Sequence, residues 1–226
     1  MDVDKDCKKD QQDKVGMDMD KLVSRFGGND VEILDRQVAH QGFFRLEELT
    51  FTHRLFEGGR SEVLKRELFL RDDAACVLLY DPERDAVVLI EQFRVGALKD
   101  PNGPWLLELI AGIIEPGESD MEVARREAQE EAGAEILELV PICNYHVSPG
   151  GSQEYIHLMC AKVDSRGLSG YHGLEQEGED IRVTVVSRQT AYTAVESGRI
   201  NNAPTIMALQ WLQLNWTMLQ DQWSKQ

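Results

Sequence analysis

Hydrophobic and polar positions alternate in short segments over much of the chain, which is the pattern of β-strands. Residues 31–55 are rich in Val, Phe, Leu and Thr, and after the glycine turn at 57–59 a second segment of this kind covers 61–71. Two apolar runs, 75–80 and 86–93, flank the turn sequence DPERD. They predict a hairpin whose strands are covered on both faces.

Further strands are predicted in the second half of the chain. Residues 104–112 form an apolar run typical of a buried strand, and 136–147 and 154–164 predict a hairpin around the loop SPGGSQ. Residues 180–186 predict a late strand. Strands mixed with a few helices, without a regular βαβ order, indicate an α+β fold with a mixed sheet.

Two helices are predicted near the C-terminus. Ser187 is a candidate cap for a helix that continues through Val195 and stops at Gly198. Residues 204–223 have apolar positions spaced alternately by three and four, which predicts an amphipathic helix packed on its own domain or on a partner. The residues with this spacing are Leu209, Leu212, Trp216, Leu219 and Trp223.

The composition limits the kinds of partner. A formal charge of −16 over 226 residues argues strongly against nonspecific binding to nucleic acid or to an anionic membrane surface, because both need cationic patches. The first twenty or so residues have almost no apolar side chains, so we expect residues 1–25 to be a disordered acidic extension.

The four cysteines are scattered and form no metal-binding or disulfide pattern: Cys7, Cys76, Cys143 and Cys160. They indicate thiols in a reducing compartment. The N-terminus has no apolar segment typical of a signal peptide, and no run of eighteen apolar residues occurs. We therefore expect a cytoplasmic protein without a membrane segment.

The segment GIIEPGESDMEVARREAQEEAGA, residues 112–134, contains an unusually acidic helix. Ser119 followed by Glu122 forms a capping box and Gly133 is a left-handed stop, so the helix is expected at about 120–132. At 100° per residue, Met121, Ala124, Ala128 and Ala132 share an apolar face. Burial of that face prevents the acidic side from rotating away to relieve its charge repulsion.

Glu127 and Glu131 lie about 40° apart on this helix and point the same way, with Glu130 beside them. A hard divalent cation such as Mg²⁺ would relieve their repulsion, since it binds few carboxylates together with water and phosphate oxygens. Arg126 can neutralise part of the remaining charge and orient one carboxylate, with Glu118 as a candidate partner. The preceding loop could add a backbone carbonyl as a ligand, such as that of Ala111.

The same segment resembles the Nudix box of the Nudix hydrolases. Its first glycine, Glu118 and the run REAQEEAGA that begins at Arg126 stand at the spacing of that motif. Ala128 and Ala134 depart from it, because the family usually has a larger aliphatic residue there, which bears on packing and not on metal chemistry.

The likeness covers about residues 26–223 and implies a Nudix fold: a mixed sheet between helices, with an N-terminal β subdomain at 26–70 and the hydrolase domain at 71–226. Pro149, sixteen residues after the last glycine of the box, resembles the proline of the branch that acts on ADP-ribose. The resemblance implies Mg²⁺-dependent, or Mn²⁺-dependent, hydrolysis of ADP-ribose to AMP and ribose 5-phosphate. It also implies a homodimer in which the N-terminal strands of one subunit help to build the partner's substrate site.

The resemblance assigns roles to individual residues. Glu127, Glu131, Glu179 and the carbonyl of Ala111 would bind Mg²⁺, and Glu177 in the loop GLEQEGED would be the general base. A carboxylate needs a raised pKa to act as a base, which neighbouring negative charge and partial desolvation would supply.

Glu130 is the alternative base, and Arg126 is expected in the catalytic group. Residues expected to contact the substrate are Phe43, Arg66, Arg94, Pro149, Gly150 and Gly151. Each has an ordinary alternative: the phenylalanine can be core, the arginines surface ion pairs, the glycines a hairpin turn, and the acidic loop a solvated loop.

Three other functions stay open on the sequence. The protein could cleave another nucleoside diphosphate sugar, since the Nudix box binds the diphosphate and not the groups that flank it. It could bind a nucleotide sugar without turnover, although the glutamates of the box are intact. It could be an acidic interaction protein, which would show no metal dependence.

Overall fold

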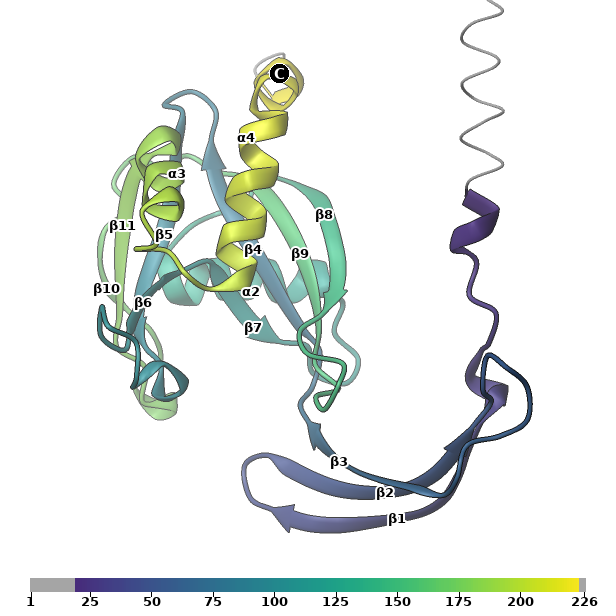
Figure 1. Ribbon diagram of the computed structural model, residues 1–226. Helices are drawn as coiled ribbons and strands as arrows, with labels where there is room; N and C mark the ends of the chain where they lie inside the picture. Colours follow the sequence, from purple (N-terminus) through teal and green to yellow (C-terminus); the bar gives the residue numbers. More distant parts are fainter. Residues whose placement is uncertain (1–18, 224–226) are drawn as a thin grey trace, which may run out of the picture. The chain divides into compact units, whose positions relative to one another are not determined.

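The structure, a computed structural model, describes residues 19–223, and these form parts of two compact units, Met1–Phe69 and Leu70–Gln226 (Figure 1). Residues 1–18 lie outside the described part, so most of the expected extension at 1–25, and Cys7 with it, is not tested. Within the rest of that segment, Asp20–Leu22 forms a 3-10 helix, η1.

The N-terminal unit is built on a three-stranded sheet with the order β1-β2-β3. The strands are β1 Val31–Gln41, β2 Arg45–His53 and β3 Leu64–Leu70, preceded by the 3-10 helix η2, Gly28–Asp30. The long strand-like segment at 31–55 is therefore two antiparallel strands joined by a turn at 42–44. Every residue of β1 is exposed within this unit.

The C-terminal unit contains an eight-stranded mixed sheet with the path β10-β11-β5-β4-β9-β8. The hairpin predicted from the runs at 75–80 and 86–93 is confirmed as β4 and β5, and β9 lies parallel to β4. The six strands of this path are β4 Ala74–Asp81, β5 Ala86–Phe93, β8 Glu138–His146, β9 Tyr155–Lys162, β10 Gly170–His172 and β11 Ile181–Ser187. Short 3-10 helices occur at Val95–Ala97 (η3) and Glu175–Glu177 (η4).

The prediction of a single strand at 104–112 is wrong, because the structure divides this segment into two strands. β6, Trp105–Glu108, pairs with the end of β5, whereas β7, Ile110–Ile113, pairs with the start of β4. Only the other ends of β4 and β5 pair with each other, so the two strands diverge and β6 and β7 fill the space between them. Leu109 forms the break and is buried.

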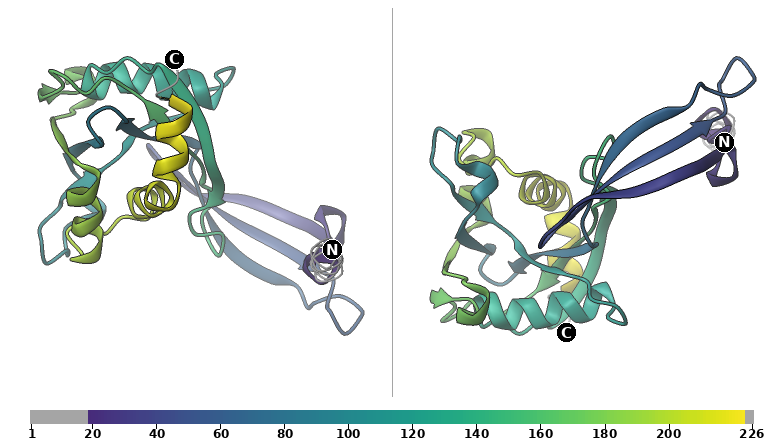
Figure 2. Two further views of the ribbon diagram at one scale, coloured as in Figure 1. Left: turned by 90° about the horizontal axis from the view of Figure 1, so that it is seen from above. Right: turned by 90° about the horizontal axis from the view of Figure 1, so that it is seen from below.

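Helices cover both faces of this sheet (Figure 2). α2, Asp120–Ala132, packs on one face, whereas α3, Arg188–Glu196, and α4, Ala203–Trp223, pack on the other. A separate apolar core fills each of the two layers. The expected α+β fold with a mixed sheet between helices is confirmed.

The two C-terminal helices agree with their sequence patterns. The Ser187 side chain accepts a hydrogen bond from the backbone N–H of Thr190 and caps α3. The apolar stripe of α4 is buried at Leu209, Leu212, Leu219 and Trp223. Among residues 19–223, no helix is both long and apolar enough to cross a membrane.

Candidate functional site

The acidic helix α2 begins and ends where its sequence predicts. The Ser119 hydroxyl accepts from the Glu122 N–H, and the Glu122 carboxylate accepts from the Ser119 N–H at 2.8 Å, which completes a capping box. At the other end Gly133 has φ of 62°, a left-handed conformation that suits glycine. Local hydrogen bonds therefore set the length of the helix independently of the sheet beneath it.

The buried face of α2 differs from the expected one at its first turn. Ala124, Ala128 and Ala132 are buried as expected, but Met121 is 55% exposed and Val123 is buried instead. Val123 and the three alanines pack in one core with residues of β4 and β7, whereas Met121 lies outside that core. The small alanines allow close packing of helix on sheet, which explains how the chain tolerates alanine at position 128.

Glu131 is only 2% exposed, although it is a carboxylate. Its Oε2 accepts a hydrogen bond from the backbone N–H of Ala111, with N and O 3.1 Å apart. This bond joins β7 to α2 at Ala111, the residue whose carbonyl the sequence suggested as a metal ligand.

Glu127 lies directly over Gly112 in β7. A Cβ atom added to Gly112 would be 1.9 Å from Oε1 of Glu127 and 2.4 Å from its Cγ. This glycine is therefore required by the close approach of the glutamate, and not by its backbone conformation, since its φ is not positive.

The electrostatics of these two glutamates are unfavourable for charge. Burial raises the pKa of Glu127 to about 7 and that of Glu131 to about 8. Negative charge on Glu179 adds to both increases, whereas Arg126 lowers the pKa of Glu127 and the Ala111 N–H lowers that of Glu131. Repulsion among the three carboxylates thus adds to burial in disfavouring their charged forms.

Arg126 joins the carboxylates of the box. Its guanidinium lies 2.7 Å from Oε1 of Glu127, 3.2 Å from Oε2 of Glu130 and 3.3 Å from Oε1 of Glu118. Partial burial works against its charge, but the hydrogen bonds to Glu118 and Glu127 outweigh that cost and raise its pKa. The expected pairing of Arg126 with Glu118 is confirmed, and the guanidinium holds the Glu127 carboxylate in one orientation.

Glu108 is a member of this region that the sequence reasoning missed. It ends β6, and its Oε2 lies 2.7 Å from Nε of Arg94, whose charge also lowers the pKa of Glu131. The signal in the sequence was a lone acid inside the apolar run PWLLELIAG. Arg94 thus forms an ion pair, which was the ordinary alternative to substrate binding for this residue. Its guanidinium also lies near enough to lower the pKa of Glu131, which together with Glu127 we call the metal-type glutamates.

The acidic loop before β11 contains Glu179 and Glu177. Oε2 of Glu179 accepts from the Leu174 N–H at 3.2 Å, and Gly173 makes room for it, since an added Cβ there would be 2.7 Å from Cβ of Glu179. The side chain of Glu177 lies outside the described part of the structure, so its role as a base stays a prediction.

The other expected substrate residues belong to the β8–β9 loop and to the N-terminal unit. Pro149 and Gly150 are exposed, and Gly151 is partly buried, in the loop between β8 and β9. Neither glycine has a positive φ, and a Cβ at either would meet nothing within 4 Å, so turn geometry does not require glycine there. Phe43 and Arg66 belong to the N-terminal unit: Phe43 is 88% exposed in the β1–β2 turn, and Arg66 donates to the carbonyl of Lys65. The roles of these five residues stay predictions.

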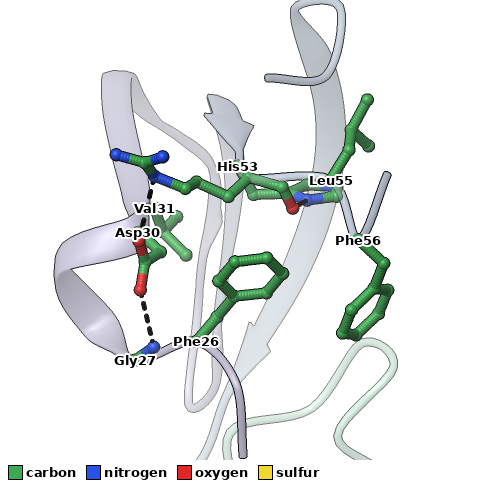
Figure 3. A pocket seen from close by; sticks show the side chains of 8 residues that line it. Phe26, Gly27, Asp30, Val31, His53, Leu55 and Phe56 are labelled. Carbon is green, nitrogen blue, oxygen red and sulfur yellow. Dashed lines mark hydrogen bonds and ion pairs between the residues drawn. The ribbon is translucent and has the colours of Figure 1, made fainter. Parts of the chain in front are cut away.

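A pocket of about 360 Å³ lies within the N-terminal unit (Figure 3). The rings of Phe26 and Phe56 line it with centroids 5.2 Å apart, and its carboxylate, Asp30, is paired with Arg54 at 3.1 Å. Because that acid is already neutralised by an arginine, the pocket lacks the unbalanced negative charge that distinguishes the glutamates of α2.

The residues around α2 fit a hard divalent cation. Buried Glu131 and partly buried Glu127, both with raised pKa values, a nearby third carboxylate and a close backbone segment supply oxygen donors. Glycine at position 112 leaves room for the Glu127 side chain. Among the described residues, no group of three or more His, Cys, Asp or Glu side chains is arranged to hold a metal ion by itself. Mg²⁺ uses few carboxylates and fills its octahedron with water and substrate oxygens, so a cation at α2 would take further ligands from these.

Comparisons with known proteins agree with this geometry. The NUDIX domain family model matches residues 70–209. The chain is 50% identical over 205 residues to an ADP-ribose pyrophosphatase of Escherichia coli K12, covering 91% of this chain and 98% of that protein. It is 34% identical over 192 residues to a GDP-mannose pyrophosphatase of Cronobacter sakazakii, covering 83% and 97%.

A solved structure described as an ADP compounds hydrolase has the same fold. It matches with a TM-score of 0.61 and 22% identity, and the match covers 82% of this chain and 96% of that one. Together with the match to residues 70–209, these findings show that the chain belongs to the Nudix family.

Proposed function

We propose that the protein hydrolyses the diphosphate bond of ADP-ribose, giving AMP and ribose 5-phosphate, with Mg²⁺ or Mn²⁺ as cofactor. The observation that supports this most directly is the 50% identity over nearly the whole chain to an ADP-ribose pyrophosphatase. Glu127 and Glu131 on α2, whose pKa values burial raises, supply the carboxylates that such chemistry needs.

The cation would be held by Glu127, Glu131, Glu179 and the backbone carbonyl of Ala111. When bound, it supplies positive charge that offsets the negative charge of the diphosphate and lowers the pKa of water at the site. The protein's own part is to hold these oxygens in place: Arg126 orients Glu127, and the Ala111 N–H orients Glu131.

In the hydrolysis, the oxygen of a water bonds to one phosphorus and the bond from that phosphorus to the bridging oxygen breaks. The bridging oxygen leaves on the other phosphate, and the proton that the water loses goes to a carboxylate base. Glu177 is our first candidate for this base. Glu130 is the second, but its carboxylate is already bound to Arg126, an ion pair that proton uptake would have to break.

Substrate contacts are proposed for Phe43, Arg66, Arg94 and the loop from Pro149 to Gly151. Arg94 carries a charge that reaches Glu131, and an exposed aromatic ring such as Phe43 suits stacking on a base. Guanidinium groups suit phosphate oxygens.

We also propose that the protein is a homodimer. β1 exposes large apolar side chains along its length, which is costly unless another surface covers them: Val31, Ile33, Leu34 and Val38. Light scattering after size exclusion would give about twice the 25.6 kDa chain mass for a dimer, whereas the chain mass itself would contradict it. A cytoplasmic location is proposed because Cys76, Cys143 and Cys160 are free thiols, as in a reducing compartment. Burial and the nearby charge of Glu108 raise the pKa of the Cys76 thiol to about 12.

The proposed activity is tested by a substrate panel of ADP-ribose, ADP-mannose, UDP-glucose and GDP-mannose with Mg²⁺. We expect the highest kcat/KM for ADP-ribose, with AMP as a product. Hydrolysis of another nucleoside diphosphate sugar in preference would favour the second candidate function, for which the 34% identity to a GDP-mannose pyrophosphatase is the supporting observation. No turnover of any of the four, with Mg²⁺ or Mn²⁺, would contradict both.

The two candidate bases are separated by paired variants. Glu177→Gln should lower kcat at least a hundredfold, which is the size of effect expected for loss of a general base. Glu130→Gln should lower it less if Glu177 is the base, and the reverse order would assign the base to Glu130.

A further inference from the structure

His157 contacts the first residue of the acidic helix. Its Nδ1 lies 3.1 Å from Oδ2 of Asp120, and the other oxygen of Asp120 accepts from the Met121 N–H at 2.8 Å. Because an ionised carboxylate can only accept, the Nδ1–H of His157 is the donor of this bond.

The strand that carries His157 presents it to the helix. Successive side chains along β9 point to opposite faces of the sheet. Ile156 and Leu158 pack in the core beneath α4, whereas Met159 packs in the core beneath α2. His157 shares the side of Met159. The ring of Tyr155, with its centroid 5.5 Å from that of His157 and nearly perpendicular to it, packs against the imidazole.

The register of the sheet relates this contact to the metal-type glutamates. Gly112 in β7 is opposite Ala75 in β4, and Ala75 is opposite His157 in β9, so the three form one row across the sheet. α2 contacts this row at both ends, through Glu127 over Gly112 and through Asp120 at His157.

The spacings of the two contacts match. Two strand separations give about 9.6 Å along the row. Seven residues of α-helix, from Asp120 to Glu127, give about 10.5 Å along its axis. A shift of α2 along its axis by one residue would therefore break the contact at one end or force Glu127 off Gly112.

We propose that His157 is a positioning residue of the proposed hydrolysis, which sets the axial position of α2 and so the placement of Glu127 and Glu131. The proposal rests on the proposed function for its kinetic readout, but its binding readout needs only the metal. His157 acts through Asp120 and the helix, and we assign it no contact with substrate.

The test compares three substitutions of His157. In Asn the side-chain nitrogen stands at the position of Nδ1, so His157→Asn should keep the bond, whereas His157→Ala removes it and His157→Gln places the nitrogen too far out. Loss of this hydrogen bond is expected to lower kcat and the Mg²⁺ affinity measured by calorimetry about three- to tenfold. KM for ADP-ribose should change less than twofold, and His157→Asn should restore both quantities.

Two further variants test the coupling. Asp120→Ala should reproduce the effect of His157→Ala, and the double variant should lose no more than either single one, because the two residues form one interaction. The matched control is His146→Ala, which removes a histidine that packs on the same Tyr155 ring at 4.7 Å. It should keep the kcat and metal affinity of the parent protein.

Parent-like kcat and Mg²⁺ affinity in His157→Ala and Asp120→Ala would overturn the proposal. An equal loss in His157→Asn and His157→Ala would overturn it too, because the loss would then follow ring volume and not the hydrogen bond. If the His157 variants fail to fold, partly exposed Asp120 carries the same test. A parent protein that binds Mg²⁺ but hydrolyses none of the nucleotide sugars would contradict the proposed function, while the calorimetry would still decide the role of His157.

Discussion

Gly112→Ala should inactivate the protein with little effect on its fold. The added methyl group would be 1.9 Å from Oε1 and 2.3 Å from Cδ of Glu127, and an ordinary van der Waals contact begins at 3.4 Å. The carboxylate must therefore move by at least 1.5 Å, the difference of these two distances. Its Cγ, at 2.4 Å, must move as well, so a rotation of the carboxylate alone does not remove the clash.

Two effects on stability oppose each other in this variant. Overpacking costs about 1–3 kcal/mol. Replacing a strand glycine by alanine recovers roughly 0.5–1 kcal/mol of backbone entropy, since Gly112 does not need a positive φ. The net change, from about zero to a loss of about 2.5 kcal/mol, is small beside the stability of a typical domain. The effect on the reaction is larger, because a displacement of about 1 Å in a catalytic group costs about a hundredfold in rate.

The assay measures kcat and KM for ADP-ribose over a Mg²⁺ titration, with thermal unfolding in parallel. We expect kcat to fall by about a hundredfold, the Mg²⁺ requirement to rise, and the unfolding temperature to fall by only a few degrees. Gly96→Ala is the matched control, because an added Cβ there meets nothing within 4 Å and its φ is not positive. Parent-like kcat and metal affinity in Gly112→Ala would refute the argument that Glu127 needs this glycine.

Three further predictions concern the buried charges. Glu131→Gln keeps an acceptor for the Ala111 N–H but cannot ionise to bind the cation, so kcat should fall at least a hundredfold. The metal-free unfolding temperature should be unchanged or higher, because burial already disfavours the charged form of Glu131, and a lower one would contradict the assignment. Arg188→Met removes two hydrogen bonds to Asp85, at 2.8 and 2.9 Å, and one to Gln213. It should lower the free energy of unfolding in urea by about 2 kcal/mol, less than for a fully buried pair because Asp85 is partly exposed. A change below about 0.5 kcal/mol would contradict this prediction. Mg²⁺ at a hundred times its dissociation constant should stabilise the parent protein by about 2.7 kcal/mol, and the increase should disappear with EDTA and be absent in the Glu131 variant.

Local chemistry made the acidic helix predictable from the sequence. The capping box at Ser119 and Glu122 and the left-handed Gly133 are interactions between near neighbours in the chain, so they define the helix at 120–132 without knowledge of the sheet. The same holds for the β4–β5 hairpin, whose turn residues lie between two apolar runs. Family membership was likewise readable, because the residues of the box stand close together in the chain.

The division of residues 104–112 could not be predicted in the same way. Both halves are apolar and equally suited to a strand, and only the divergence of β4 and β5 gives each half a different neighbour. Glu108 was missed for a related reason. Its interest comes from Arg94 and Glu131, which are distant from it in sequence.

The sequence alone determined that Glu127 and Glu131 share one side of a helix, since helical periodicity is a property of the chain. Whether that side meets water or a sheet was decided only by tertiary packing, which buries Glu131 against the Ala111 N–H and places Glu127 over Gly112. Burial is what raises the pKa values of both glutamates, because removing water disfavours charge. The periodicity thus supplied the carboxylates, and the sheet supplied the environment in which a cation binds them.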